Sequence, residues 1–550
     1  MSSPITSSLN GAAPAQPSRL PWLRAGAFAI AGLIGLPVVV VLANLLIPRS
    51  ETWQHLASTV LPDYIVNTLV LATLVGAGVV VLGAGCAWLT TACRFPMAHF
   101  FQWALLLPLA TPAYVMAYAY TDFLQFAGPL QGALRAATGW RAGEYWFPDV
   151  RSLGGAAFVL VFVLYPYVYL LARTAFLEQS AAALESARML GHGPWRSFFR
   201  IALPLARPGI AAGTALCLME TLADYGTVAY FGVNTFSTGI FRAWFSLGDA
   251  VAAAQLGALL LAGVAAVLAL ERFARGEAAF HSSGRKRMAP YALSGWRAAA
   301  AWTACALPLA AGFIVPAALL LRLAFQEREV AIGARFLHLA WNSLTLAGVA
   351  SLLAVGCALI VAYAVRMRPG IAERVANRVA GFGYAIPGVV IAVGVMVPLT
   401  RVDHWLADAL PGTAGKLIFS GTVAALLYAY LVRFLAVALQ SVEAGLAKIR
   451  RSMDDAARSL GAGPGETLAR VHAPLLARSL LAAALLVFVD VMKELPATLA
   501  LRPFDFDTLA VQTFNLAKDE RLSEASIPAL AIVVVGLIPV YLLARSMARQ

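Results

Sequence analysis

The chain has 550 residues, of which 60% are hydrophobic and only 13% are charged. Soluble domains carry about 25% charged residues, so this composition excludes a soluble enzyme, a disordered chain and a secreted disulfide scaffold. It favours a protein that crosses a membrane many times. Membrane β-barrels alternate apolar and polar residues, whereas this chain has continuous apolar runs such as 253–270. The spans are therefore expected to be helices.

Twelve apolar stretches have the length of a membrane-spanning helix, which needs about 20 apolar residues. They fall into two sets of six, and we expect an all-α integral membrane protein with about 12 transmembrane helices. The first set covers 25–47, 68–90, 102–124, 154–176, 208–232 and 251–271; the second covers 298–322, 343–365, 380–400, 417–440, 479–500 and 526–545.

Basic residues are distributed unevenly between the two sides of the membrane. With a cytoplasmic N-terminus, the cytoplasmic segments hold roughly twice as many Lys and Arg residues as the external ones, as the positive-inside rule requires. The net charge of +13 is therefore an orientation signal, and no nucleic-acid partner is expected. We predict a multi-pass protein of a bacterial inner membrane, surrounded by lipid, with the N- and C-termini in the cytoplasm.

The two halves of the chain repeat each other. Asn67 to Ala72 matches Asn342 to Ala347, and Pro112 and Pro387 keep the same offset of 275 residues. The strongest match aligns 185–205 with 455–475 without a gap, with nine of 21 positions identical. Because each half holds six spans, the repeats are expected to lie parallel and to share an axis along the membrane normal.

These observations predict two modules joined by a basic linker that holds Arg285, Lys286 and Arg287. The predicted boundaries are a disordered cytoplasmic tail at 1–22, a first module at 23–272 with a coupling loop at 178–207, a basic cytoplasmic linker at 273–297, and a second module at 298–550 with a coupling loop at 445–478.

The repeated loop resembles the permeases of binding-protein-dependent ABC importers, which share the pattern Glu-Ala-Ala-x3-Gly-x9-Ile-x-Leu-Pro. The second copy departs from it at Asp455, Val471 and Ala473, and the first copy has Ser186 in place of Ala. The resemblance implies that this loop is a coupling helix that docks on a cytoplasmic ABC ATPase dimer. The residues carried over are Glu185, Ala187, Gly191 and Pro204 in the first half, and Asp455, Ala457, Gly461 and Pro474 in the second.

Residues 220–244 and 490–510 also resemble fused permeases for ferric iron. The resemblance implies alternating access and a periplasmic solute-binding protein that delivers the cargo. It also implies that ATP and Mg bind the partner ATPase, while this chain is not an enzyme and binds no cofactor. Thiamine or organophosphonate remains an alternative cargo, and an ion-driven secondary transporter or a membrane scaffold without cargo remains an alternative class.

Five ionisable residues lie within predicted spans. Glu220 and Asp224 are four residues apart and share a helix face, and Asp490 and Glu494 repeat this spacing 270 residues later, with Lys493 beside them. A charge at the bilayer centre costs roughly 2.5–3.5 kcal/mol, so these groups must face water, become neutral or pair. They are predicted to line or gate a path for a cationic cargo; the alternative is polar contact that holds the spans together.

No metal site is expected, because the seven histidines form no HxxxH or HxH pair and the five cysteines form no CxxC. His192 and His472 lie in the coupling loops and are predicted to be surface residues. Gly415-Lys416 is preceded by Leu410 and followed by Leu417, so it does not form a phosphate-binding loop.

Overall fold

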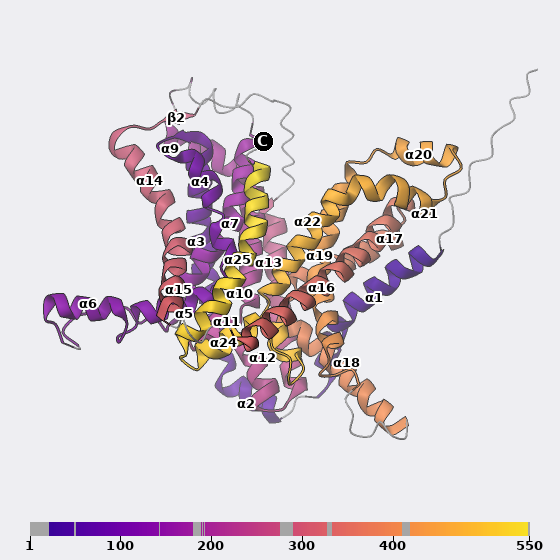
Figure 1. Cartoon of the computed structure of the whole chain (residues 1–550), viewed down its shortest axis with the longest axis horizontal. Helices are drawn as coiled ribbons and strands as arrows, with labels where there is room; N and C mark the ends of the chain where they lie inside the picture. The colour runs from indigo at the N-terminus through magenta and orange to yellow at the C-terminus, as the bar shows by residue number, and fades with distance from the viewer. Residues whose placement is uncertain are drawn as a thin grey trace, which may run out of the picture.

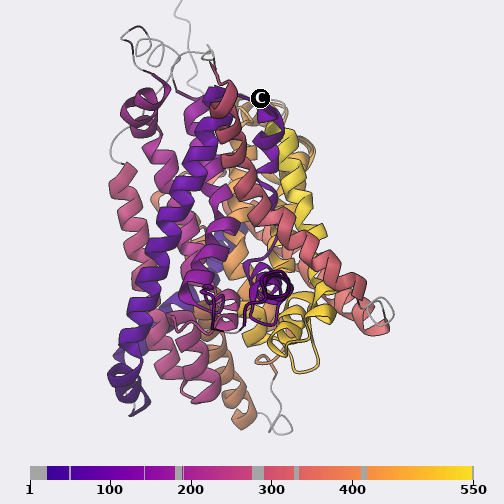
Figure 2. The same cartoon turned by 90° about the vertical axis from the view of Figure 1, so that its left-hand side faces the viewer.

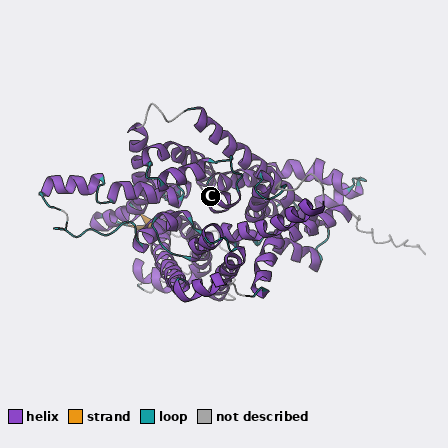
Figure 3. Cartoon of the chain, turned by 90° about the horizontal axis from the view of Figure 1, so that it is seen from below, coloured by secondary structure: helices purple, strands orange, loops and turns teal. Residues whose placement is uncertain are grey.

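The computed structural model describes residues 21–48, 51–141, 143–179, 189, 191, 193–275, 290–326, 333–409 and 418–547. Nearly every element in this part of the chain is a helix (Figure 3). Eleven helices are long and apolar enough to cross a membrane, and a bent pair brings the number to 12. The predicted all-α membrane fold is confirmed.

The first half contains six spans and several short elements. Its elements are α1 (Pro21–Ala43), η1 (Asn44–Leu46), α2 (Glu51–Thr59), α3 (Leu61–Ala92), β1 (Cys93–Arg94), α4 (Ala98–Ala104), η2 (Leu107–Ala110), α5 (Ala113–Leu124), α6 (Pro129–Thr138), α7 (Leu153–Leu177), α9 (Pro194–Ser197), η3 (Phe198–Ala202), α10 (Leu203–Ala223), α11 (Gly226–Tyr230), α12 (Phe236–Phe241), η4 (Arg242–Ser246) and α13 (Ala250–Arg275).

The second half repeats this order after a short strand. Its elements are β2 (Tyr291–Ala292), α14 (Gly295–Leu309), η5 (Ala310–Ile314), α15 (Val315–Gln326), α16 (Ala334–Met367), α17 (Ile371–Ala380), η6 (Gly383–Ala385), α18 (Gly388–Ala409), α19 (Val423–Ala447), α20 (Arg451–Ser459), α21 (Pro464–Thr467), η7 (Leu468–His472), α22 (Ala473–Met492), α23 (Pro496–Leu501), α24 (Leu509–Lys518) and α25 (Leu522–Met547).

The first helix of each half packs on the other half. α1 contacts α16, α17 and α18, whereas α14 and η5 contact α3, α4 and α7 (Figures 1 and 2). Ala27, Ile34 and Val41 lie seven residues apart along α1 and are all buried, which is the stripe that a helix presents to a packing partner. The boundary between halves in the sequence is therefore crossed in space at two places.

Both segments predicted to couple to an ATPase lie at one end of the molecule. α9, α20, α21 and the C-terminus lie at that end, and α2, α12, α18 and α24 lie at the other (Figure 1). This is the relative placement that six spans in each half require. The helices that border the predicted linker extend into it, because α13 ends at Arg275 and β2 pairs in parallel with β1. Residues 276–289 lie outside the described residues.

The expected end of the N-terminal tail at residue 22 is slightly wrong, because α1 begins at Pro21. Proline has no backbone N–H to satisfy and its fixed φ suits the first turn of a helix. Residues 1–20 lie outside the described residues.

The third span of each half is not the straight helix that the sequence predicted. The chain breaks before Pro112, where the helices on either side are bent by 91°, and before Pro387. Thr111 and Ile386 have extended backbones, with ψ of 118° and 125°. Proline disfavours the helical conformation in the residue before it, so the repeated prolines account for the repeated break.

The fifth spans end earlier than predicted, at Ala223 rather than 232 and at Met492 rather than 500. Each is followed by a short helix, α11 or α23, which belongs to the inner lining of the molecule. The apolar pattern continues through these short helices and therefore hides the break.

The repeat predicted from Asn67 and Asn342 has a structural counterpart. The Asn67 side chain donates to the carbonyl oxygen of Asn234 at 2.9 Å, and that of Asn342 donates to Asp507 at 3.2 Å. In the next position, the hydroxyl oxygen of Ser343 accepts from Leu509 N–H at 2.8 Å. In both halves these residues fix the segment that follows the short helix.

Candidate functional site

A cavity of about 130 Å³ lies between the two halves and brings all five predicted path residues together. α10 and α11 contribute from the first half, and α22 contributes from the second. The breaks before α5 and α18 open toward the same place, since Thr111, Pro112 and Tyr384 also line it. The predicted charged residues in the cavity are Glu220, Asp224, Asp490, Lys493 and Glu494.

Asp224 and Glu494 bind the first turns of the short helices. The Asp224 carboxylate accepts from the N–H groups of Thr227 and Val228 at 3.0 and 3.1 Å. Glu494 accepts from Ala497 and Thr498 at 2.8 and 2.9 Å. A carboxylate here satisfies helix N–H groups that have no partner within the helix and stabilises the positive end of the helix dipole. These two acids therefore shape the cavity wall.

Glu220 and Asp490 lie one turn earlier and face the cavity more openly. Their side chains are 26% and 20% exposed, against 2% for Glu494. Lys493 Nζ lies 2.9 Å from the Asp490 Oδ1 atom, so these two groups form an ion pair within α22. Of the four acids, Glu220 and Asp490 are the better placed to meet a cargo.

Arg433 is the cation that the sequence reasoning missed. It lies in α19, its Nη1 is 3.4 Å from Glu494 Oε1, and its Nη2 is 4.0 Å from Glu220 Oε2. It thus links an acid of each half across the cavity. The sequence analysis had counted Arg433 with the cytoplasmic basic residues, and the signal was its position within the apolar run 423–439. An arginine inside a span marks a functional site by the same argument as the acids.

Gly388 makes room for this ion pair. A Cβ atom on Gly388 would lie 2.3 Å from Arg433 Nη1 and 3.0 Å from Glu494 Oε1. Any other side chain would therefore displace the arginine. Two tyrosines complete the polar wall, since Tyr384 lies within hydrogen-bonding reach of both Glu220 and Tyr167.

A second pocket of about 560 Å³ lies beside this cavity and shares Tyr225 with it. Tyr225 stacks on Phe241, with ring centroids 3.9 Å apart, and lies 6.0 Å from the ring of Phe514. These rings separate the two spaces. The pocket is lined by three basic side chains, Arg151, Arg242 and Lys518.

The second predicted coupling loop is described throughout its length. α20 ends with a Schellman motif, because Gly461 N–H donates to Arg458 at 2.9 Å and Ala462 N–H donates to Ala457 at 3.0 Å. Gly461 has φ of 83°, a conformation that favours glycine. The predicted role of this glycine in ending the helix agrees with that geometry, and Gly191 has φ of 75°. Glu185 and Ala187 lie outside the described residues.

Two details of this loop differ from the prediction. Ala457 is 7% exposed, so its small side chain packs inside the protein instead of meeting a partner surface. Asp455 is exposed and its Oδ1 lies 2.6 Å from Nη2 of Arg458 in the same helix.

The short helix predicted to end at Pro204 is instead continuous with α10. A π-helical turn precedes Pro204 and another precedes Pro474. Proline cannot donate to the carbonyl four residues earlier and clashes with it, and a wider turn relieves both problems. The repeated prolines thus join each coupling segment to a span through a bend.

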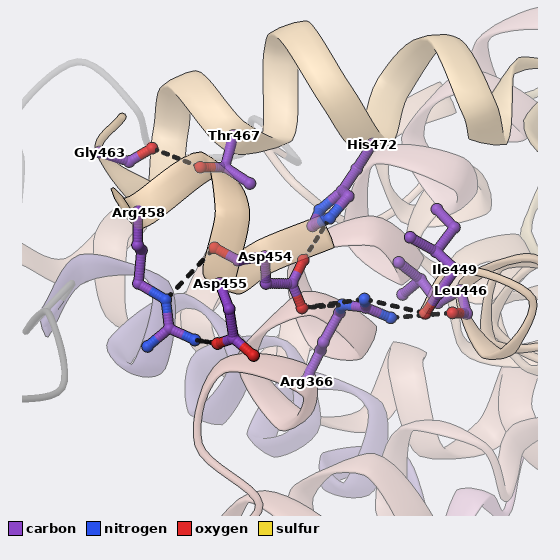
Figure 4. Close-up of polar contacts among 9 residues, drawn as sticks. All are labelled: Arg366, Leu446, Ile449, Asp454, Asp455, Arg458, Gly463, Thr467 and His472. Atoms are coloured by element: carbon purple, nitrogen blue, oxygen red, sulfur yellow. Dashed lines mark hydrogen bonds and ion pairs between the residues drawn. The ribbon is translucent and has the colours of Figure 1, made fainter. Parts of the chain in front are cut away.

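The prediction that His472 is a surface residue is wrong, because it is 0% exposed. Its Nε2 lies 2.5 Å from Asp454 Oδ1, and Asp454 also pairs with Arg366 (Figure 4). His192 lies outside the described residues. Across the described ranges, no three His, Cys, Asp or Glu side chains come together in a way that could hold a metal ion.

The sequence is similar to known permeases along almost its whole length. It is 26% identical to the Fe(3+)-transport system permease protein FbpB 2 of Haemophilus influenzae, over 93% of this chain and 96% of that protein. It is 22% identical to the putative ferric transport system permease protein FbpB 1 of the same organism, over 82% of this chain and 72% of that one.

Other similarities cover single halves. The putative 2-aminoethylphosphonate transport system permease protein PhnU of Salmonella choleraesuis is 26% identical over 34% of this chain and 65% of that protein. A crystal structure of a bacterial ABC transporter involved in the import of alginate has a TM-score of 0.31 and 16% identity, over 42% of this chain and 87% of that one.

The family described as binding-protein-dependent transport system inner membrane component matches residues 18–276 and 354–550. These ranges include both coupling loops and all the charged residues of the cavity. The chain belongs to this family of multi-pass inner-membrane permeases of ABC importers.

Proposed function

We propose that the chain forms the transmembrane path of an ATP-driven importer for ferric iron, with cargo entering from a periplasmic solute-binding protein. The observation that carries the proposal is the charge of the central cavity. Four carboxylates, at Glu220, Asp224, Asp490 and Glu494, face two cations, Arg433 and Lys493. The excess of two negative charges favours a cationic cargo. Carboxylate oxygens are also the hard ligands that suit a highly charged metal ion.

The same contacts argue for passage rather than for tight binding. Asp224 and Glu494 are engaged by backbone N–H groups, and Asp490 is engaged by Lys493. A permeating ion must be bound weakly enough to leave. The full-length similarity to a permease named for Fe(3+) transport supports the same cargo.

The drive is proposed to come from a cytoplasmic ABC ATPase dimer that binds ATP and Mg, with one coupling loop on each subunit. Both loops lie at one end of the molecule (Figure 1). Each exposes a large apolar side chain, since Met189 is 89% exposed and Leu460 is 88% exposed. Apolar side chains left in water at matched positions support a docking partner. Both termini are proposed to lie on the same, cytoplasmic side, which agrees with the positive-inside count.

Reconstituted transport tests the cargo. The permease, its ATPase and its periplasmic binding protein are placed in liposomes, and uptake of radioactive ferric iron is measured with ATP inside the ATPase-accessible compartment. We expect iron uptake that an excess of thiamine or 2-aminoethylphosphonate does not reduce. Uptake of either organic compound without uptake of iron would contradict the assignment.

The basic outer pocket favours a second candidate, an anionic cargo such as a phosphonate. Arg242 lies 3.1 Å from the side-chain oxygen of Asn234 and lines the pocket with Arg151 and Lys518. Similarity to permeases named for 2-aminoethylphosphonate agrees with this candidate. An Arg242→Gln variant separates the two, because it weakens uptake of an anion and leaves uptake of free Fe³⁺ unchanged or higher. Family membership argues against an ion-driven secondary transporter and against a scaffold without cargo.

A further inference from the structure

A buried polar cluster ties the second coupling helix to the spans beneath it (Figure 4). Arg366 lies in the last turn of α16 and donates to the carbonyl oxygens of Leu446 and Ile449 at 2.8 and 3.1 Å. These carbonyls follow the end of α19 and have no partner within that helix. Arg366 Nε also donates to Asp454 Oδ2 of α20 at 3.1 Å.

The other oxygen of Asp454 faces a different helix. His472 Nε2, at the start of α22, lies 2.5 Å from Asp454 Oδ1, and the histidine ring packs edge-on against Tyr363 with centroids 5.6 Å apart. The side chains of Arg366, Asp454 and His472 are 10%, 14% and 0% exposed. Little water screens the cluster, so its charged hydrogen bonds are strong. One carboxylate therefore joins α16, α20 and α22, and through Arg366 it also joins the end of α19.

The first half has no such cluster. At the matching offsets the sequence has Thr91 for Arg366, Leu184 for Asp454 and Ala202 for His472. The Thr91 hydroxyl donates to Ala87 of its own helix at 2.7 Å, and Ala202 is buried. Leu184 lies outside the described residues, but its side chain has no charge to pair. The tie between a coupling helix and several spans is a property of the second half.

The helices joined by Asp454 are those that carry the charged wall of the cavity. α19 holds Arg433, and α22 holds Asp490, Lys493 and Glu494. A displacement of α20 must move these helices with it or break the buried contacts. In the first half, the described connection from the coupling segment to α10 is the π-helical turn alone.

We propose that Asp454 is a positioning residue that makes the second coupling loop the stiffer of the two levers, so that ATPase movement reaches the cavity mainly through α19 and α22. The proposal rests on the proposed function, in which both loops dock on an ATPase. It assigns unequal mechanical roles to two halves that otherwise share their architecture.

The test is the number of cargo molecules moved for each ATP hydrolysed by the reconstituted complex with its loaded binding protein. In Asp454→Asn we expect the ATPase to stay bound and to hydrolyse ATP, while the transport ratio falls by at least about fivefold, the lower range of known coupling energies. His472→Ala, which has the residue found at Ala202 in the first half, is expected to lower the ratio in the same direction. It removes one contact only and decides the matter if Asp454→Asn does not assemble.

Glu466→Gln is the matched control, because Glu466 is an acid of the same loop whose ion pair with Arg470 is exposed. Its transport ratio is expected to equal that of the unsubstituted complex. An unchanged ratio in Asp454→Asn and His472→Ala overturns the proposal, and so does a parallel fall of hydrolysis and uptake, which indicates lost docking. If the unsubstituted complex moves cargo without hydrolysing ATP, the proposed function fails instead.

Discussion

Asp224 and Glu494 stand 270 residues apart and make the same contacts, each accepting hydrogen bonds from the backbone N–H groups three and four residues later. Each acid follows the end of a fifth span and caps the short helix that lines the cavity. The pair therefore has a structural role in the wall, whereas Glu220 and Asp490 are left to face the interior. This division separates the five predicted path residues into two kinds and leads to different expectations for each.

Removing a capping acid is expected to lower stability. Asp224→Ala leaves two N–H groups of α11 without an acceptor, and the loss of such a cap costs about 1 kcal/mol. Thermal unfolding of the detergent-purified protein measures it. Asp224→Asn keeps an acceptor oxygen and is the matched control, expected to unfold closer to the unsubstituted protein. Equal unfolding temperatures for Asp224→Ala and the unsubstituted protein would contradict the capping role.

Glu220 and Asp490 are expected to affect transport more than stability. Glu220→Gln and Asp490→Asn keep the size of each side chain but reduce the negative charge that faces a cationic cargo, so uptake falls while the complex still assembles. Uptake in liposomes and the amount of assembled complex are measured together. Glu524→Gln, in an exposed ion pair with Arg521, is the control for a charge change elsewhere. Full uptake in both cavity variants would support the alternative that these acids only hold the spans together.

The ion pair of Arg433 and Glu494 is expected to be strongly coupled. Arg433→Met leaves Glu494 buried without its cation, and breaking a buried pair in this way costs about 3–5 kcal/mol. Adding Glu494→Gln removes the unpaired charge, so the double variant is expected to recover part of the stability. Unfolding measured on both single variants and the double variant gives the interaction energy. If the effects of the two substitutions simply add, the residues do not act as a pair.

Leu460 tests docking without disturbing the fold. Its side chain is 88% exposed at the end of α20, so Leu460→Asp removes apolar surface from a docking site and little from the protein itself. We expect the ATPase to be lost from the purified complex while the unfolding temperature stays the same. Leu460→Met preserves an apolar side chain and is expected to retain the ATPase. Substituting Gly461 is a poorer test, because its φ of 83° strains other residues. Undiminished co-purification with Leu460→Asp would place the docking surface elsewhere.

Much of the fold follows from the sequence because a bilayer leaves few choices. Apolar runs of the required length predict helices, since every backbone polar group must be satisfied within the span. The matched Asn67 and Asn342 predict a repeat, and both form the equivalent contact. The breaks before Pro112 and Pro387 were open to prediction from the effect of proline on the preceding residue. Their apolar surroundings concealed them.

The site was predicted in part. The regular spacing of Glu220, Asp224, Asp490 and Glu494 brought attention to the cavity, because charges within spans are costly. Arg433 obeys the same rule and was assigned to a loop because it lies near the edge of a basic segment. His472 was assigned to the surface because its sequence neighbours are polar. Its burial depends on Arg366, which is 106 residues earlier in the chain, and no local pattern contains such a contact.

The central claim is that work done by a separate ATPase drives cargo through the cavity between the halves. The most direct measurement is cargo uptake into liposomes that contain the permease and its ATPase, with loaded binding protein outside and either ATP or a non-hydrolysable analogue available to the ATPase. We predict uptake with ATP only, and none when the ATPase is left out. Uptake that continues undiminished without the ATPase would contradict the account.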